Sequence, residues 1–308
     1  MTKNAMPSPK AITRSKIIII GGEIGGVGKS MVARAMIEQT IAAKHPFYLI
    51  DADTSTPNVG LTYEKEMYER FRAGGSPEKT NVIPTMYSAD GTPPVLQGQI
   101  TFTGNAKNYF EADQIIVLAQ TKDVVVVLPS QVATYVQHWI KQNDIIGMLA
   151  DPENTIDVYY FFVTNGTPES IALFAESVES CQGKIPHILV KNYGAATNIN
   201  WSWFDYDNKA ATILNQYGFK SLIFPELEVL PEVKTKIISE NISFSSAIAD
   251  KWMSPPSKRR IKRWLGEATI ALGSTDLVPY HPDYLPKPPE TSELPKIATN
   301  GQAVEAAA

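Results

Sequence analysis

The sequence predicts a single α/β domain with a doubly wound, mostly parallel sheet, arranged as a three-layer sandwich. Short runs rich in β-branched residues alternate with helix-compatible segments along the 308-residue chain. The runs are continuously apolar, as strands buried on both faces of a parallel sheet must be. The polar residues 1–13 and the Pro-rich residues 274–308 are expected to be disordered, which leaves the domain at 14–273.

The apolar runs give the expected strands in chain order. They are Lys16–Ile20, Pro46–Ile50, Val124–Leu128, Val158–Val163, His187–Lys191 and Leu222–Phe224. The expected helices between and after them cover 30–44, 131–149, 168–181, 205–217 and 227–240. The stretch 64–110 breaks the alternation: Tyr63–Arg72 is charged enough to form an exposed helix, and 81–110 is expected to be a long loop.

Composition limits the class of protein. Hydrophobic residues make up 44% and charged residues 19% of the chain, and the net charge is −4, values typical of a soluble globular protein. A basic surface that binds nucleic acid must therefore be local. The one cysteine, Cys181, cannot form an internal disulfide and is expected to be a small packed side chain. Because the first apolar run, 17–20, is too short for a signal peptide or a membrane span, we expect a cytoplasmic protein.

A glycine-rich loop follows the first expected strand. It reads GGEIGGVGKS over residues 21–30 and leads into a helix-compatible segment. Glycines let backbone N–H groups turn inward around phosphate oxygens, and the helix N-terminus adds its dipole. In such a P-loop the lysine, here Lys29, reaches the β- and γ-phosphates, and the next hydroxyl, here Ser30, binds Mg²⁺. The sequence therefore predicts an ATP and Mg²⁺ site, although the general motif has glycine where Glu23 stands.

The loop resembles the variant P-loop of the ParA/MinD superfamily of ATPases. The resemblance implies a P-loop NTPase fold and assigns a catalytic role to Lys29. It implies nucleotide contacts from Gly25, Gly26, Val27, Gly28, Lys29, Ser30 and Met31. In that family the lysine at the position of Ile24 reaches the partner's phosphates in an ATP-dependent homodimer. Isoleucine donates no hydrogen bond, so hydrolysis activated in this way is in doubt, while dimerisation stays open.

An acidic pair follows the second expected strand. Asp51 and Asp53 are two residues apart, so they share a face of an extended chain. The segment resembles the Asp-x-Asp switch of the ParA/MinD ATPases. The resemblance implies that Asp53 is a catalytic residue that positions the attacking water, and that Asp51 lies near the metal. The alternative is a solvated pair that caps the loop.

The third acidic element of the family is missing. Val127 stands where the metal-associated aspartate is expected, and Asp123 lies at the wrong end of its strand to replace it. Ser130 and Gln131 could bind a water there or could simply start a helix. Hydrolysis is therefore expected to be weak, unless Asp51 provides more of the contacts around the metal than is usual in the family.

Base recognition is expected after a later strand. The family offers an asparagine from a Val-x-Asn pattern to the adenine edge, and Asn192 matches it, with Asn165 as a rival one strand earlier. Pro225 resembles the proline that packs beside the base. The aromatic residues Trp201, Trp203 and Phe204 follow Asn192, and such clusters are more often core than ligand sites.

A basic amphipathic helix is expected near the end of the domain. Its basic residues are Lys258, Arg259, Arg260, Lys262 and Arg263, and its apolar face holds Ile261, Trp264, Leu265, Ala268 and Leu272. Such a helix can bind DNA phosphates, lie on an anionic membrane, or pack on the body with its charges in water. A membrane role is the least favoured of the three.

Three functions remain open. The first is an ATPase switch in plasmid partition, stability or conjugative transfer, with a partition or transfer protein as partner. The long loop at 81–110 and the aromatic segment resemble the TraL and StbB type within the superfamily. The second is a nucleotide-binding regulator or scaffold with little hydrolysis. The third is an ATP-dependent metabolic enzyme of the same superfamily.

Overall fold

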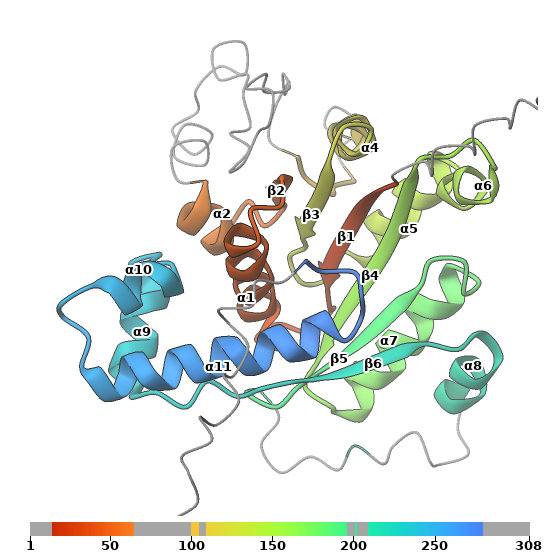
Figure 1. Cartoon of the computed structure of the whole chain (residues 1–308). Coiled ribbons are helices and arrows are strands. Elements are labelled where there is room, and N and C mark those ends of the chain that lie inside the picture. Colours follow the sequence, from red (N-terminus) through yellow and green to blue (C-terminus); the bar gives the residue numbers. More distant parts are fainter. Residues whose placement is uncertain (1–13, 65–99, 105–108, 196–200, 202–208, 280–308) are drawn as a thin grey trace, which may run out of the picture.

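The protein is a three-layer α/β domain, seen in a computed structural model that describes residues 14–64, 100–104, 109–195, 201 and 209–279 (Figure 1). All strand pairs in the described part are parallel, and the six strands follow the order β2-β3-β1-β4-β5-β6. The strands are β1 (Ser15–Gly21), β2 (Phe47–Asp51), β3 (Asp123–Val127), β4 (Ile156–Thr164), β5 (His187–Asn192) and β6 (Lys220–Phe224). The predicted fold class and all the expected strands are confirmed.

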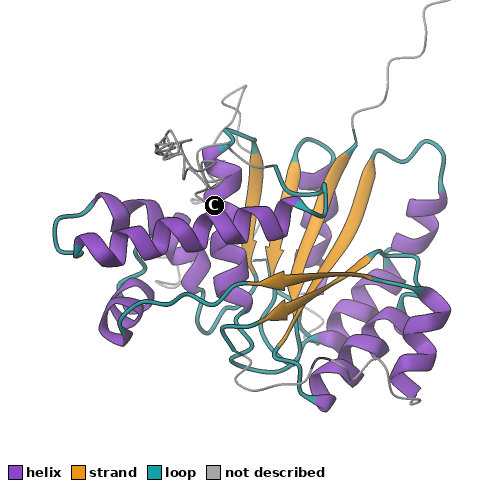
Figure 2. Cartoon of the chain, turned by 60° about the horizontal axis from the view of Figure 1, so that its bottom comes forward, coloured by secondary structure: helices purple, strands orange, loops and turns teal. Residues whose placement is uncertain are grey.

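The helices connect these strands and cover both faces of the sheet (Figures 1 and 2). Between β1 and β3 lie α1 (Lys29–Ala42), α2 (Asn58–Tyr63), the 3₁₀ helix η2 (Tyr109–Asp113) and α4 (Gln114–Ala119). Between β3 and β6 lie α5 (Ala133–Gln142), α6 (Ile145–Ala150), α7 (Pro168–Ser180) and α8 (Lys209–Tyr217). The chain then forms α9 (Pro231–Ser239), α10 (Phe244–Ala249) and α11 (Pro255–Gly273).

The isoleucine run of β1 divides the core in two. Ile17 and Ile19 face one apolar cluster, which includes residues of α4, α5, α6, α7 and α8. Ile18 and Ile20 face the other cluster, which includes residues of α1, α9, α10 and α11. Because side chains alternate along a strand, a central strand with both faces covered must be apolar at every position, and β1 is.

The helix α1 also carries a buried polar network. Arg34 is 1% exposed and donates to the carbonyl oxygens of Asn58, Ile237 and Ile242 at 3.2, 3.4 and 3.4 Å. Glu38 accepts hydrogen bonds from the Tyr63 hydroxyl and the Phe244 N–H at 2.9 and 2.7 Å. These contacts join α1 to α2, α9 and α10, and the sequence pattern did not reveal them.

Several element boundaries differ from those expected. The helix predicted at 131–149 is broken, because Asp144 takes a left-handed conformation with φ 43° and its side chain caps α6 through the Gly147 N–H. The helix predicted at 227–240 begins only at Pro231. Thr275 and Val278 are still buried, so packing continues beyond the predicted boundary at 273. Most of the excursion at 64–110, and the start of the helix predicted at 205–217, lie outside the described residues.

Candidate nucleotide site

The glycine-rich loop joins the end of β1 to the start of α1, as predicted. Gly26 and Gly28 have φ values of 77° and 95°, the left-handed region that favours glycine. A Cβ at Gly28 would lie 2.1 Å from the Asn192 Nδ2 atom, so no side chain fits at this position. Ser30 lies exposed in the first turn of α1, and Met31 follows it. The loop therefore has the backbone conformation and the helix N-terminus of a phosphate cradle.

The Lys29 ammonium is folded back onto the loop. It donates to the carbonyl oxygens of Gly22 and Ile24 at 2.8 and 3.1 Å, and to the Ser130 hydroxyl at 2.8 Å. Burial lowers the pKa of Lys29 to about 8, while the nearby Glu23 and Asp53 carboxylates act in the opposite direction. Phosphate oxygens would have to replace these neutral acceptors, and a charged acceptor binds an ammonium more strongly than a neutral one.

Glu23 explains why this loop departs from the general glycine pattern. Its carboxylate accepts a hydrogen bond from the Ala133 N–H at 3.1 Å, at the start of α5. Its carbonyl oxygen accepts from the Gln131 N–H at 3.2 Å. Together with the bond between Lys29 and Ser130, these contacts fix the segment between β3 and α5 against the loop. Ser130 and Gln131, which the sequence left between a water site and a helix start, both bind the loop itself.

Asp51 lies at the carboxyl end of β2, but its carboxylate serves α2. It is 2% exposed and accepts the N–H groups of Val59 and Gly60 at 3.0 and 2.9 Å, and that of Asp53 at 3.2 Å. Burial raises the pKa of Asp51 to about 7, against the effect of these hydrogen bonds. The two α2 bonds satisfy N–H groups that a helix N-terminus leaves unpaired. A metal ion near Asp51, as the sequence predicted, would have to share this carboxylate with the three backbone N–H groups that already donate to it.

Asp53 follows in the loop after β2 and is only partly buried. It accepts hydrogen bonds from the backbone N–H groups and the hydroxyl groups of Ser55 and Thr56, at 2.7–3.1 Å. Burial alone would raise the pKa of Asp53, but these bonds outweigh it and lower the pKa. Asp53 therefore stays an anion, and its charge acts on the Lys29 ammonium.

Asn192, at the end of β5, contacts the glycine-rich loop directly. Its Nδ2 donates to the Val27 carbonyl oxygen at 2.6 Å, and its Oδ1 accepts from the Gly194 N–H at 3.1 Å. The rival Asn165 instead accepts the N–H and the hydroxyl of Thr167, the N-cap residue of α7, at 3.2 and 3.0 Å. Of the two asparagines, Asn192 is the one that lies beside the loop.

A pocket of about 240 Å³ opens next to this contact. Gly26, Gly28 and Met31 line it from the loop side, and Asn192 and Pro225 line it from the ends of β5 and β6. One water needs roughly 10–15 Å³ of such a volume, so the pocket has room for a much larger group. The structure thus brings together the loop, the asparagine and the proline that the sequence suggested for the base.

Trp264 and Lys234 are among the lining residues of this pocket that were not predicted as part of a site. Trp264 of α11 lines it and donates its Nε1–H to the Pro225 carbonyl oxygen at 3.0 Å. Lys234 of α9 lines it as well. The helical spacing of Trp264 predicted burial, but no local signal placed it near Pro225, because the two residues meet only through tertiary packing.

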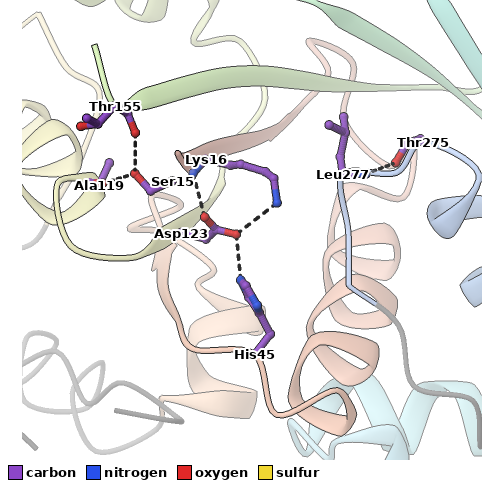
Figure 3. Close-up of polar contacts among 8 residues, drawn as sticks. All are labelled: Ser15, Lys16, His45, Ala119, Asp123, Thr155, Thr275 and Leu277. Atoms are coloured by element: carbon purple, nitrogen blue, oxygen red, sulfur yellow. Dashed lines mark hydrogen bonds and ion pairs between the residues drawn. The ribbon is translucent and has the colours of Figure 1, made fainter. Parts of the chain in front are cut away.

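Both departures from the family motif are apolar packing positions. Ile24 packs against the cluster that holds Val27 and α1, and Val127 is 3% exposed in the same cluster. Asp123 lies at the opposite end of β3, where it contacts the Lys16 ammonium at 3.6 Å and the His45 Nε2 at 2.9 Å (Figure 3). Asp123 therefore cannot stand in for the missing aspartate, as the sequence indicated.

The basic helix is packed on the body. The predicted apolar residues Ile261, Trp264, Leu265, Ala268 and Leu272 are all buried. In Figure 1, α11 lies beside α1 and β6, and it packs against both elements. Arg259, Arg260 and Lys262 are exposed, while Arg263 pairs with Glu228 and Glu267 at 3.0 and 3.7 Å. The apolar face is thus not available for a membrane, but the exposed basic residues can meet an anionic partner.

Other predicted residues have structural surroundings. Cys181 is buried, as expected. Trp201 stacks on Tyr193 with ring centroids 5.7 Å apart, whereas Trp203 and Phe204 lie outside the described residues. Among the described residues, no cluster of His, Cys, Asp or Glu could hold a metal ion on its own, and no helix could span a membrane.

The strand order and the loop after β1 define an α/β fold of the P-loop class. No protein-family model and no curated protein matches the chain. Among solved structures it is similar to the MinD cell division protein of Aquifex aeolicus, with 16% identity and a TM-score of 0.38, over 84% of this chain and 97% of that one. In a MinC:MinD complex from the same organism, the identity is 16% and the TM-score 0.43, over 84% and 96% of the chains.

A plasmid partition protein from Borrelia burgdorferi is also similar, with 17% identity and a TM-score of 0.38, over 74% of this chain and 96% of that one. At such identities the likeness concerns the fold alone. The strand order, the loop and the contacts of Lys29 therefore define the site.

Proposed function

We propose that this protein is a ParA/MinD-like switch that binds ATP with Mg²⁺ and acts in the cytoplasm in plasmid partition, stability or conjugative transfer. The observation that supports this most strongly is the juxtaposition of Lys29 with the pocket beside Asn192. A phosphate cradle and a pocket for the base are adjacent, and both lie at the carboxyl ends of parallel strands, where α/β proteins bind nucleotides.

The residues present fit a bound nucleotide. Lys29 exchanges its contacts with the loop carbonyls and Ser130 for phosphate oxygens, and the backbone N–H groups from Gly25 to Met31 bind the phosphates. Asn192 and Pro225 hold the base. Ser30 is the hydroxyl ligand for Mg²⁺, which neutralises phosphate charge when bound. Asp53, ionised and close to Lys29, positions the attacking water.

An ATP-dependent homodimer and non-specific DNA are the proposed partners, beside a partition or transfer protein. The DNA surface is the exposed basic side of α11, with Lys258, Arg259, Arg260, Lys262 and Arg263. Because each phosphate contact releases counterions, this binding weakens steeply with salt. Replacing Arg259, Arg260 and Lys262 by glutamate should abolish DNA binding at about 50 mM salt. The matched control reverses Lys209, Lys220 and Lys184, which lie outside α11.

The second candidate is a regulator that binds ATP with little turnover. Ile24 and Val127 favour it, since both replace charged residues of the family motif and both pack in the apolar cluster around α1. In this case ATP binding itself is the signal, and hydrolysis contributes little.

Steady-state phosphate release, measured with and without plasmid DNA, separates the two. The switch predicts Mg²⁺-dependent release that DNA or a partner stimulates and that Asp53→Asn abolishes. Saturable ATP binding without release above the Lys29→Ala background in either condition would rule out the switch and leave the regulator.

A further inference from the structure

A second cavity lies on the other face of the sheet, between α5 and α7. Its volume is about 40 Å³. Because one water needs roughly 10–15 Å³ of such a cavity, it corresponds to about three heavy atoms. Val136, Ile140, Phe162 and Leu173 give it apolar walls, and Glu23 of the glycine-rich loop lines it as well.

The Tyr160 hydroxyl is the first polar group of this cavity. Tyr160 is 3% exposed and lines the cavity. Its hydroxyl lies over the last residue of β1, since a Cβ at Gly21 would be 2.3 Å from it. Within the described part of the chain, the hydroxyl has no hydrogen-bond partner. Buried hydroxyl groups are normally bonded, so one that faces a cavity without a partner indicates a missing ligand or water.

The second polar group is the Glu23 carboxylate. One of its oxygens accepts the Ala133 N–H, which leaves acceptor capacity on the group. Burial raises the pKa of Glu23, and burial also raises the pKa of Tyr160, with the Glu23 charge adding to the effect. Glu176 lines the same cavity, and no lysine, arginine or histidine does. The cavity is therefore negative, small and mostly apolar.

We propose that this cavity binds a primary alkylammonium ion, with its –NH₃⁺ group between Glu23 and Tyr160. An ammonium offers three N–H donors, which suits a carboxylate and a hydroxyl oxygen, and its alkyl carbons contact the apolar walls. A divalent metal ion needs about six oxygen ligands, more than these walls supply. A neutral alcohol brings no positive charge to the two carboxylates that line the cavity.

The cavity borders an outer depression into which a longer alkyl chain can extend. This depression shares Gln137, Ile140, Ser180 and Cys181 with the cavity and extends past Lys141 and Asp144 at the end of α5. A chain longer than two carbons can therefore run outward between α5 and α7. The site shares only Glu23 with the glycine-rich loop, and its other lining residues come from β4, α5, α7 and Cys181, so it does not rest on the proposed nucleotide function.

Ligand-detected NMR tests the site on the full-length protein without nucleotide, using ethylammonium as the probe and ethanol as its neutral analogue. We expect saturable ethylammonium binding and no ethanol binding. Glu23→Gln, which keeps the shape and removes the charge, should weaken ethylammonium binding at least tenfold. Tyr160→Phe should weaken it severalfold, and Glu179→Gln, an exposed carboxylate of α7 outside the cavity, should leave it unchanged.

Three results would overturn the site: no saturable ethylammonium binding, equal binding of ethanol, or loss of affinity that is as large in Glu179→Gln as in Glu23→Gln. Thermal unfolding checks that each variant is folded. If Glu23→Gln does not fold, Tyr160→Phe and the ethanol comparison decide the matter. Repeating the titration with the Lys234→Ala variant, which alters only the pocket beside Asn192, separates this site from the nucleotide site, since ethylammonium affinity should not change.

Discussion

The Lys29 ammonium lies 2.8 Å from the Ser130 hydroxyl, across the gap between the glycine-rich loop and the segment that follows β3. Under the proposed function, Lys29 must give up this contact to bind phosphate. Ser130→Ala should therefore raise ATP affinity, by about fivefold if the bond is worth about 1 kcal/mol. Equilibrium titration with a fluorescent ATP analogue measures it, with Ser274→Ala on the far end of α11 as control. A fall in affinity would mean that Ser130 serves the nucleotide instead.

Asn192 and Asn165 provide a matched pair. Asn192 bonds the Val27 carbonyl oxygen in the loop, whereas Asn165 bonds Thr167. We expect Asn192→Ala to reduce ATP affinity about tenfold, since a buried carbonyl loses its donor and the pocket loses an amide. Asn165→Ala should change ATP affinity less than twofold. Equal losses in the same titration would contradict the assignment of Asn192.

Asp51 and Asp53 should differ in what they support. Asp51→Asn places an amide NH₂ against the N–H groups of α2, so the free energy of unfolding should fall by about 1–3 kcal/mol. Asp53→Asn keeps an acceptor in an exposed loop and should cost less than about 1 kcal/mol. Phosphate release should fall about 100-fold or more in Asp53→Asn. Urea unfolding and phosphate release are measured on both variants. A larger loss of stability in Asp53→Asn, together with a larger loss of phosphate release in Asp51→Asn, would contradict these roles.

His187 should make stability depend on pH. Its Nδ1–H donates to the Ile185 carbonyl oxygen at 2.7 Å, and the Ser177 hydroxyl lies 3.0 Å from Nε2. Burial lowers the pKa of His187 from 6.5 to about 4. The unfolded chain therefore binds a proton first as pH falls, and stability is lost between about pH 6.5 and 4, by roughly 3 kcal/mol.

His187→Phe removes this titration. Its free energy of unfolding should decline less than that of the unmodified protein over the same pH range, because the remaining groups titrate alike in both. Urea unfolding at pH 7, 5.5 and 4 gives the difference. Parallel pH profiles would show that His187 is not buried in its neutral form.

The sequence predicted the sheet and the loop well because both depend on local patterns. Four isoleucines in a row before a glycine loop specify a central strand and a turn without knowledge of the partner elements. The break at Asp144 was missed because a left-handed aspartate costs little when its side chain caps the next helix, and the pattern of apolar residues continues across it.

The tertiary contacts of the site could not be predicted in this way. Asp51 reads as a metal-associated carboxylate beside Asp53, yet it caps α2, which only the folded loop reveals. Lys234, Trp264 and Tyr160 carry no motif, and each reaches its cavity through helix or strand packing. In the sequence Glu23 is only a departure from the glycine motif. In the structure its carboxylate accepts a hydrogen bond from the Ala133 N–H, which connects the loop to α5.

The most direct test of the nucleotide site is ATP affinity in the Lys29→Ala variant. Isothermal titration with ATP and Mg²⁺ should show saturable binding to the unmodified protein and an affinity at least tenfold lower in Lys29→Ala. The variant lacks the ammonium group that contacts the loop carbonyl oxygens. Lys234→Ala gives a comparison from the base pocket, with a smaller loss expected. An unchanged affinity in Lys29→Ala would contradict the assignment of the loop as the ATP site.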